Sequence, residues 1–333
     1  TDSDLDGVVT GAILRRWWPN ADIKFGHPGN LRAGMMDHLI TRNTAICDLP
    51  RHPKCGLSID HHQSNKPIDK GDSETVVLWE ETPSAARIAY NILKEKLDLT
   101  DLTEMMGWVD KLDGGSITIE EFMGHNPVLW LGRIIGEDEE ITMNILENIQ
   151  NKVPVKDILE IPEIRIKLEE RREKQEYLGE IISENIQIID RLAIARLENL
   201  KVRSNGYHVT AIAGKECDAC LVIHGDIGAG FDEEGSYPLS ASFYTNSFIH
   251  KSGGVFDLTK LRGLESKQIF LMDYLYNGYG HAHNIAINED TGYAYIAGAG
   301  TKGIYAFNLS DPIAPKLELE GSQFGYSHDA QIV

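Results

Sequence analysis

The chain has 333 residues, of which 42% are hydrophobic and 25% charged. This composition is typical of soluble globular proteins and too rich in apolar residues for a disordered chain. The 51 acidic residues outnumber the 32 basic ones and give a net charge of −19. Such a charge argues against a protein that coats long duplex DNA or RNA, because phosphate binding needs a basic surface, although it leaves room for a local basic groove. No apolar run reaches the roughly 18 residues of a membrane-spanning helix, so no membrane partner is expected.

The cysteines and the chain ends favour a cytoplasmic protein cut from a longer sequence. Four cysteines are too few and too scattered for a disulfide framework, which indicates a reducing compartment. Cys217 and Cys220 form a solitary CxxC, for which neither zinc nor redox chemistry is expected. A strand is expected before the polar cluster at Thr1, and residues 329–333 end the chain on an apolar, strand-like stretch.

Residues 1–157 predict an α/β domain. Short apolar runs with strand character alternate with stretches of helical length, which indicates a doubly wound parallel sheet. The expected strands are 21–26, 44–49 and 56–59, and the expected helices are 7–18 and 82–97. Thr82, followed by Pro83, is a plausible cap for the second helix.

The rest of the chain predicts a connector, a smaller α+β domain and a tail. Residues 158–190 have helical periodicity, which predicts a connecting helix. Its acidic and basic side chains are interleaved, which indicates a solvated face; the basic ones are Arg165, Lys167, Arg171, Arg172 and Lys174. Residues 191–265 predict a strand-rich domain with strands at 192–200, 207–213, 221–224 and 239–244. Residues 266–333 contain a predicted β-hairpin at 283–297. The rival arrangement is one large α/β domain with the tail as a sheet edge.

Acidic and histidine clusters follow the predicted strands. Asp2, Asp4 and Asp6 alternate in an extended segment, so their carboxylates point to one side, and Gly7 then allows a tight turn into the helix. Three further clusters come later in the chain: Asp48, Asp60-His61-His62, and Asp110 with Asp113.

These clusters predict a divalent-metal site. The carboxyl ends of parallel strands line the crevice where ligands bind, and so many carboxylates would repel one another without cations between them. A calcium loop would need a Glu at its twelfth position, where Ile13 stands. Oxygen and imidazole ligands suit Mn²⁺ or Mg²⁺ better than a structural zinc.

In this order the clusters resemble the motifs of the DHH phosphoesterase superfamily, which holds RecJ-type exonucleases, oligoribonuclease/pAp phosphatases and cyclic-dinucleotide phosphodiesterases. The resemblance covers about residues 1–190 and implies a catalytic domain with two Mn²⁺ or Mg²⁺ ions. It implies six metal ligands: Asp2, Asp4, Asp6, Asp48, His61 and Asp110. Asp4 and Asp6 would lie on separate ions, with Asp48 bridging both.

The resemblance also implies residues that act on the substrate. His62 would meet the substrate phosphate, and we assign catalytic roles to His62 and Asp60. We further expect Lys111 and Ser84 to contact the substrate.

About residues 200–262 resemble the DHHA1 substrate-binding domain that usually accompanies this catalytic domain. Its final Gly-Gly-Gly-His-type loop is missing, because the chain reads Arg262-Gly263-Leu264-Glu265-Ser266 where the loop is expected. Gly278-Tyr279-Gly280-His281 is a weak stand-in whose flanks do not match.

The tail, about residues 267–333, resembles repeats of the LVIVD-type (choice-of-anchor B) β-propeller proteins. The similarity lies in 280–295, 303–312 and 326–331. A join of two unrelated genes near Ser266 would explain the change. His281, His283 and His328 could suggest a metal site, but scattered histidines near hairpin turns are the simpler interpretation.

Two functions remain open from the sequence. The leading hypothesis is a Mn²⁺- or Mg²⁺-dependent phosphoesterase that acts on short oligonucleotides or nucleotide-like small molecules through a metal-activated water, with a homodimer as one compatible assembly. The alternative is a catalytically impaired relic or chimera that binds metal or nucleotide but lacks the Gly-rich substrate loop.

Overall fold

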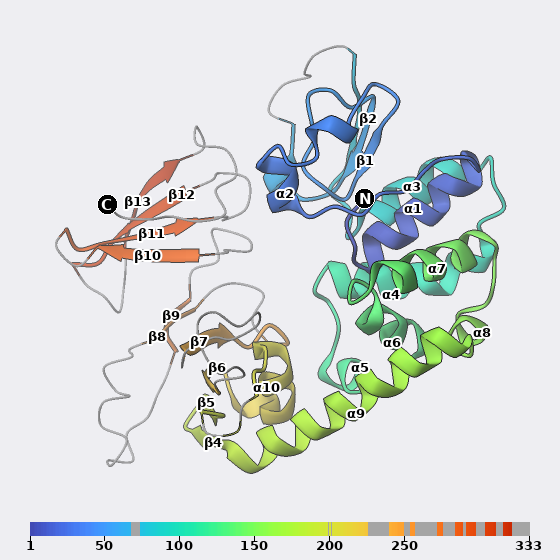
Figure 1. The fold of residues 1–333 in the computed structure, drawn as a ribbon. Helices are drawn as coiled ribbons and strands as arrows, with labels where there is room; N and C mark the ends of the chain where they lie inside the picture. Colours follow the sequence, from blue (N-terminus) through green and yellow to red (C-terminus); the bar gives the residue numbers. More distant parts are fainter. Residues whose placement is uncertain are drawn as a thin grey trace. The chain divides into compact units, whose positions relative to one another are not determined.

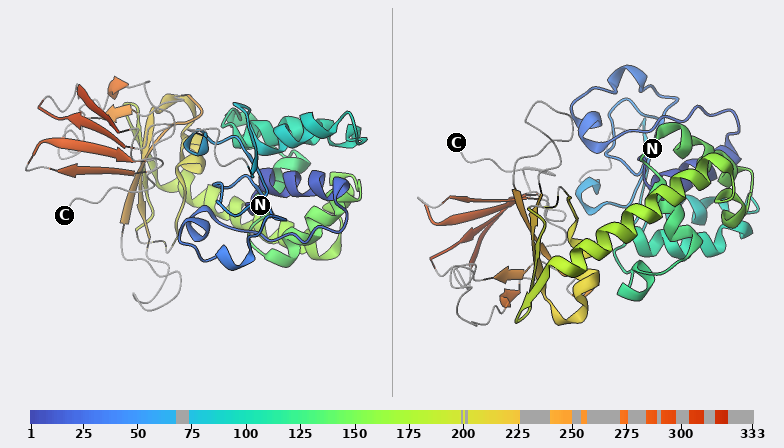
Figure 2. Two further views of the ribbon diagram at one scale, coloured as in Figure 1. Left: turned by 90° about the horizontal axis from the view of Figure 1, so that it is seen from above. Right: turned by 60° about the horizontal axis from the view of Figure 1, so that its bottom comes forward.

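The computed structural model describes residues 1–67, 74–198, 200, 202–225, 240–249, 254–256, 272–275, 284–288, 291–297, 304–310 and 316–321. The chain forms two compact units. The first comprises Thr1–Ile117 and Gly124–Arg172, and the second comprises Thr118–Met123 and Glu173–Val333. The division falls inside a long helix, α9 (Pro162–Asn185), which is green to yellow-green in Figures 1 and 2.

The first unit carries a parallel sheet in the order β1-β2-β3, covered by helices. Its strands are β1 (Ala45–Cys47), β2 (Leu57–Asp60) and β3 (Val76–Trp79). Its α-helices, besides the start of α9, are α1 (Leu5–Trp17), α2 (Pro28–Arg32), α3 (Ala85–Leu93), α4 (Thr103–Asp113), α6 (Pro127–Ile134), α7 (Glu139–Gln150) and α8 (Val155–Ile158). Three 3-10 turns, η1 (Asp37–Leu39), η2 (Gln63–Asn65) and η3 (Thr100–Leu102), complete the unit.

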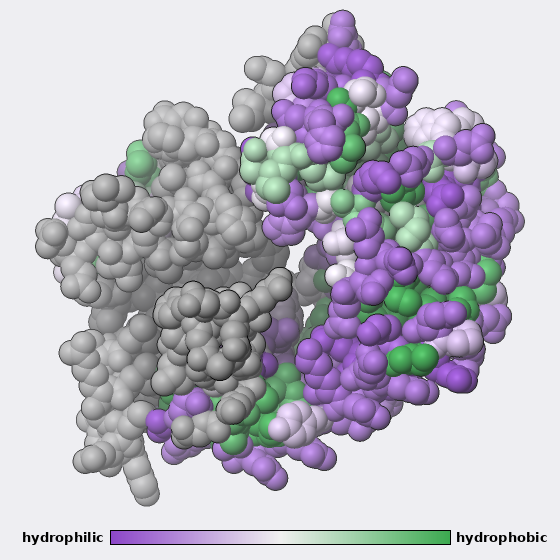
Figure 3. Space-filling view, in the orientation of Figure 1, coloured by the Kyte–Doolittle hydropathy of each residue, from purple (hydrophilic) through white to green (hydrophobic). Residues whose placement is uncertain are grey.

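Helix α1 is the centre of the first unit's core. It packs side by side with α3 and α7 (Figure 1) and also contacts β1. Its residues Val8, Val9, Ala12 and Ile13 are fully buried, and burying each large apolar side chain contributes about 1.5–3 kcal/mol. The face of the first unit that Figure 3 shows is mostly hydrophilic, with small separate hydrophobic areas. Because these residues of α1 are buried in the core, the core fixes the position of the helix start.

The second unit contains the short helix α5 (Ile119–Phe122), α10 (Gly206–Ala213) and the 3-10 turn η4 (Gly214–Glu216). A mixed sheet runs in the order β4 (Ile186–Ile189), β5 (Leu192–Arg196), β6 (Ala219–His224) and β7 (Ser240–Thr245), and only the β5–β6 pair is parallel. β8 (Gly254–Phe256) pairs with β9 (Met272–Leu275). A four-stranded antiparallel meander follows: β10 (Asn284–Asn288), β11 (Tyr293–Ala297), β12 (Ile304–Asn308) and β13 (Lys316–Gly321).

Most predicted elements of the first unit are confirmed. The strands at 44–49 and 56–59 are β1 and β2, and the helix at 7–18 is α1. The predicted strand 21–26 is wrong: this segment forms one isolated parallel bridge, between Asp2 and Gly26, with backbone hydrogen bonds from Thr1 N to Lys24 O and from Gly26 N to Thr1 O. Strand β3 was not predicted, although its sequence Val-Val-Leu-Trp is rich in the residues typical of strands.

Three further predicted elements have other bounds or another type in the structure, two of them because of a capping residue. The helix predicted at 82–97 begins after Ser84, whose Oγ accepts a hydrogen bond from Arg87 N, so Thr82 is not the cap. The strand predicted at 207–213 is helix α10, because the Asn205 side chain accepts from His208 N and caps a helix there. The helix predicted over 158–190 starts at Pro162, and residues 186–189 pair with β5 as a strand.

The later strands at 221–224 and 239–244 are confirmed as β6 and β7, and the predicted hairpin is β10–β11. The domain boundaries proposed from the sequence remain predictions. All four cysteines are buried and free, and burial raises the pKa of Cys220 to about 12, which makes redox chemistry at the CxxC unfavourable. Among the described helices, none is long and apolar enough to cross a membrane.

Gly7 and Gly107 offer a matched pair of helical glycine substitutions. A Cβ on Gly7 would lie 2.3 Å from the Asp2 carbonyl oxygen, whereas a Cβ on Gly107, within α4, would meet nothing within 4 Å. We expect Gly7→Ala to destabilise the protein by about 1–3 kcal/mol through overpacking, and Gly107→Ala to stabilise it by up to about 1 kcal/mol. Urea unfolding measures both, and equal effects would contradict the close packing of the Asp2–Asp6 segment.

Candidate metal centre

The start of α1 places two carboxylates at helix N-termini. Asp4 caps α1 by accepting a hydrogen bond from Gly7 N at 2.8 Å. Asp6, in the first turn, accepts from Ala85 N and Ala86 N at the start of α3, each at 2.7 Å. Backbone donors at two helix N-termini therefore hold these carboxylates, an arrangement that favours negative charge.

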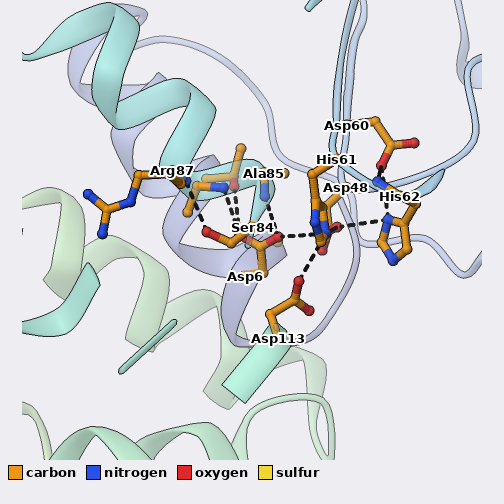
Figure 4. Close-up of polar contacts among 12 residues, drawn as sticks. Asp6, Asp48, Asp60, His61, His62, Ser84, Ala85, Arg87 and Asp113 are labelled. Carbon is orange, nitrogen blue, oxygen red and sulfur yellow. Dashed lines mark hydrogen bonds and ion pairs between the residues drawn. The ribbon is translucent and has the colours of Figure 1, made fainter. Parts of the chain in front are cut away.

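Asp48 follows β1 in a left-handed backbone conformation, with φ 56°. Its backbone N donates to Ile59 O at 2.8 Å, which ties the turn to β2. The carboxylate is buried, and its Oδ1 lies 3.6 Å from both His61 Nε2 and His62 Nδ1. The strand end thus aims the Asp48 carboxylate at the two histidines, as Figure 4 shows.

His61 is oriented by a backbone carbonyl. Its Nδ1 lies 3.1 Å from Thr82 O, and because a carbonyl only accepts, Nδ1 carries the proton and donates. Nε2 is then directed at carboxylates of three different segments, as Figure 4 shows: it lies 2.9 Å from Asp113 Oδ2, 3.6 Å from Asp48 Oδ1 and 3.7 Å from Asp6 Oδ2. Metal-binding histidines are commonly oriented in this way by a hydrogen bond at the opposite nitrogen.

Asp60 positions His62. Its Oδ1 accepts from the His62 backbone N at 3.0 Å and ring Nδ1 at 2.9 Å, and its Oδ2 accepts from Asn65 Nδ2 at 2.6 Å. Trp79 Nε1 also donates to His62 O, which ties this loop to β3. The His62 side chain is 45% exposed, so its free Nε2 can meet a ligand from solvent.

Asp110 and Asp113, three residues apart on α4, have different partners. The Asp110 carboxylate accepts from Ser84 Oγ at 2.8 Å and from Arg87 Nε at 2.9 Å, so it pairs with α3 instead of joining the cluster around His61. Asp113, the last residue of α4, contacts His61. The ligand role of Asp110 stays a prediction, and the contact with His61 makes Asp113 a second candidate from the same helix.

The predicted substrate contacts and the remaining acids also have defined places. Ser84 is fully buried, and its Oγ donates to Asp110 Oδ1 and accepts from Arg87 N, so its role as a substrate contact stays a prediction. Lys111 Nζ lies 5.4 Å from the Trp108 ring centroid. Asp2, half-buried, accepts from Ser3 N at 2.6 Å.

Burial and mutual repulsion shift the pKa values of the cluster. Burial, followed by the charges of Asp6, Asp4 and Asp113, raises the pKa of Asp48 well above its usual value. Burial and then Asp113 likewise raise the pKa of Asp6. Desolvation, then the charges of Asp113 and Asp2, raises the pKa of Asp4 to about 6.

Both histidines shift in the opposite sense to what burial alone would produce. Burial lowers the pKa of His61, but its contact with Asp113 and the charge of Asp6 outweigh that effect and raise the pKa overall. The pKa of His62 is also raised, because the hydrogen bond to Asp60 outweighs burial. A cation would satisfy the same carboxylates that these protonated rings now face.

The side chains fit a divalent cation. Asp48 Oδ1, His61 Nε2 and Asp113 Oδ2 are buried and have no hydrogen-bond partner within the described residues. Their spacing with Asp6, 2.9–3.7 Å from His61 Nε2, suits ligands that share one ion, because ligands about 2.1 Å from an ion lie roughly 3 Å apart in octahedral geometry. Two ligand groups can be drawn, Asp6-His61-Asp113 and Asp48-His61-His62. Oxygen and imidazole donors suit Mn²⁺ or Mg²⁺.

Several sequence expectations lie outside the described residues. These are the segment 262–266, the stand-in 278–281, and His281, His283 and His328.

Comparisons with known proteins support the fold. No family model matches the chain, and no curated protein matches its sequence. Among solved structures, the chain is similar to the pGpG-specific phosphodiesterase PggH from Vibrio cholerae, with a TM-score of 0.64 and 20% identity. The match covers 84% of this chain and 88% of that one. At this identity the likeness shows a shared fold, consistent with the DHH-type fold implied by the sequence, and gives no support to the propeller resemblance of the tail.

Asp113→Asn and Asp110→Asn should separate the two acids of α4. We expect Asp113→Asn to weaken Mn²⁺ binding at least tenfold by calorimetry, because it removes an ionised ligand facing His61. Asp110→Asn should keep the wild-type Mn²⁺ affinity while losing about 1–3 kcal/mol of stability with the charged bond to Arg87. The reverse pattern would assign the ligand role to Asp110 instead.

Asp48→Asn should stabilise the protein in EDTA, by about 1–3 kcal/mol at pH 8, because it removes a buried charge. The gain over wild type should be small near pH 4 and grow as the pH rises, since the raised pKa of Asp48 means that ionisation costs more in the folded state than in the unfolded state. Mn²⁺ should raise the melting temperature of wild type only.

Asp190→Asn is the matched control for Asp48→Asn. Asp190 is exposed and has the same φ of 56°, so this change tests the backbone effect without the carboxylate cluster. An equal, pH-independent gain in both variants would contradict repulsion at Asp48.

Proposed function

We propose that this protein is a divalent-metal-dependent phosphodiesterase that hydrolyses short oligonucleotides. The observation that carries the proposal is the set of buried, unpartnered ligand atoms around His61, beside the exposed ring of His62. The fold shared with PggH, whose name describes a phosphodiesterase specific for pGpG, supports a 5′-phosphorylated dinucleotide as the first substrate to test.

Asp6, Asp48, His61 and Asp113 would hold one ion, and Asp2 and Asp4 would hold a second together with Asp48. Asp48 would bridge the two, because Asp4 lies near enough for its charge to raise the pKa of Asp48, and His61 Nε2 lies 3.6 Å from Asp48 Oδ1. Two bound Mn²⁺ or Mg²⁺ ions supply a hydroxide at neutral pH and neutralise charge on the phosphoryl oxygens.

The protein's own contribution to the reaction centres on His62. Asp60 accepts a hydrogen bond from Nδ1–H and raises the pKa of the ring, which favours the imidazolium form. Nε2–H of that imidazolium can then donate to a phosphoryl oxygen as negative charge builds there. Asp60 therefore acts as a positioning residue, and His62 as the group that touches the substrate.

His62→Ala tests this division of roles. We expect it to retain two Mn²⁺ ions by calorimetry, since the ring is not required as a ligand, and to lower kcat on pGpG by about 10²–10³ through loss of a donor to developing charge. Loss of the metal ions in this variant would instead make His62 a ligand, as the group Asp48-His61-His62 allows.

The activity itself is tested with Mn²⁺ on a panel of pGpG, pAp, a cyclic dinucleotide, single-stranded DNA and bis-p-nitrophenyl phosphate. We expect Mn²⁺-dependent hydrolysis that is fastest on pGpG and absent in Asp48→Asn. Saturable binding of two Mn²⁺ without hydrolysis of any of these esters would overturn the proposal in favour of a metal-binding relic.

A further inference from the structure

Strand β3 ends on a tryptophan at the edge of the sheet that carries the candidate metal centre. Trp79 is the last residue of β3 and lies opposite Asp60 in the parallel register. Asp60 is in turn the last residue of β2, directly before His61 and His62. The carboxyl ends of parallel strands line the crevice where ligands bind, so Trp79 shares this edge with the two histidines.

The side chain of Trp79 points away from the core of the first unit. Its neighbour Leu78 packs against that core, and successive residues of a strand point to opposite faces. Trp79 is therefore only half-buried. A large aromatic ring that is partly open to solvent at this edge can contact a ligand that binds there.

Two contacts hold the Trp79 ring next to the loop that carries His62. Its Nε1 donates to His62 O at 2.9 Å, and Lys66 Nζ lies over the ring, 4.8 Å from its centroid. The single N–H of the indole is used by the first contact, so the side chain recognises any further group through its aromatic surface. Lys66 takes one face of the ring, and a planar ligand would stack on the opposite face.

We propose that Trp79 stacks on a nucleobase of the substrate and so helps to place the phosphate that His62 contacts. This inference rests on the proposed function and deepens it, because it names the part of the substrate that the site recognises. Every base has a π-face, so stacking on an aromatic side chain recognises a nucleotide without selecting one base. The Lys66 ammonium beside the ring suits the phosphate that accompanies the base. Trp79 thereby distinguishes nucleotide esters from simple phosphate esters.

Binding of a non-hydrolysable pGpG analogue, with a methylene group in place of the bridging 3′ oxygen, tests the stacking without turnover. Calorimetry in Mg²⁺ compares wild type with two variants. We expect Trp79→Leu to bind about tenfold more weakly, because it removes the aromatic face. Trp79→Phe keeps an aromatic face but loses the N–H, and should stay within about threefold of wild type. Equal weakening in both variants would mean that Trp79 only anchors the His62 loop, and would overturn the proposal.

Tryptophan fluorescence gives a second readout of the same titration, which does not depend on the leucine variant. A base that stacks on Trp79 should quench its emission, so Trp79→Phe should lose most of the change that the analogue causes in wild type. No saturable binding of the analogue to wild type, or an unaltered fluorescence change in Trp79→Phe, would overturn the proposal.

Trp17 provides the matched control. It is the last residue of α1, at the opposite end of that helix from Asp4 and Asp6. Like Trp79 it is partly exposed and has a lysine beside its ring, since Lys96 Nζ lies 5.5 Å from the ring centroid. We expect Trp17→Leu to bind the analogue as wild type does, and Trp17→Phe to keep the fluorescence change. Circular dichroism confirms that each variant is folded, and Mn²⁺ calorimetry confirms that each retains its metal sites.

A kinetic comparison tests whether the stacked base belongs to the substrate. The ratio of kcat/KM for pGpG to that for an analogue without both bases is measured in wild type and Trp79→Leu. We expect this ratio to fall about tenfold in the variant, whereas an unchanged ratio would contradict base recognition by Trp79. If neither ester is hydrolysed by wild type, the proposed function fails, while the binding titration still decides the role of Trp79.

Discussion

The arrangement of the first unit depends on one electrostatic conflict, the confinement of several carboxylates around a single imidazole. Asp6 and Asp48 are almost fully buried, and Asp113 approaches the same atom, His61 Nε2. Burial and the neighbouring charges raise the pKa of Asp48, and the neighbouring carboxylates raise that of His61, so both groups favour their protonated forms when no cation is bound. Such an arrangement lowers the stability of the folded state, and a bound cation would offset that loss.

The surrounding structure holds each charged group by neutral or backbone partners. Amides at the start of α3 hold Asp6, a carbonyl holds His61, and a turn in the left-handed region holds Asp48. Two acids near the site have side-chain partners on both carboxylate oxygens or pair with an arginine: Asp60 contacts His62 and Asn65, and Asp110 contacts Arg87. By contrast, Asp48 Oδ1 and Asp113 Oδ2 have no hydrogen-bond partner within the described residues. The oxygen atoms without such partners support the proposed ligand roles of Asp48 and Asp113.

The sequence predicted the site better where strands carry it than where helices do. Asp48 and His61 each come directly after a strand, and parallel strands end at one edge, so their convergence followed from the pattern. Asp110 and Asp113 lie three residues apart on one helix, and only the position of Arg87 on α3 decides which one turns toward His61. Helix α10 was predicted as a strand because apolar and polar residues alternate over most of 207–213, although Asn205 is a typical N-cap residue. A contact such as that between Asp110 and Arg87 joins two helices and has no signal in the local sequence.

The central claim is that the carboxylates around His61 hold a pair of metal ions. Crystals soaked in Mn²⁺ and measured at the manganese absorption edge test it most directly. The account predicts two anomalous peaks about 3.5–4 Å apart, with Asp48 between them and one of them within bonding distance of His61 Nε2 and Asp113. A cluster that stays without an anomalous peak at saturating Mn²⁺, or peaks that contact Asp110 instead of Asp113, would contradict it.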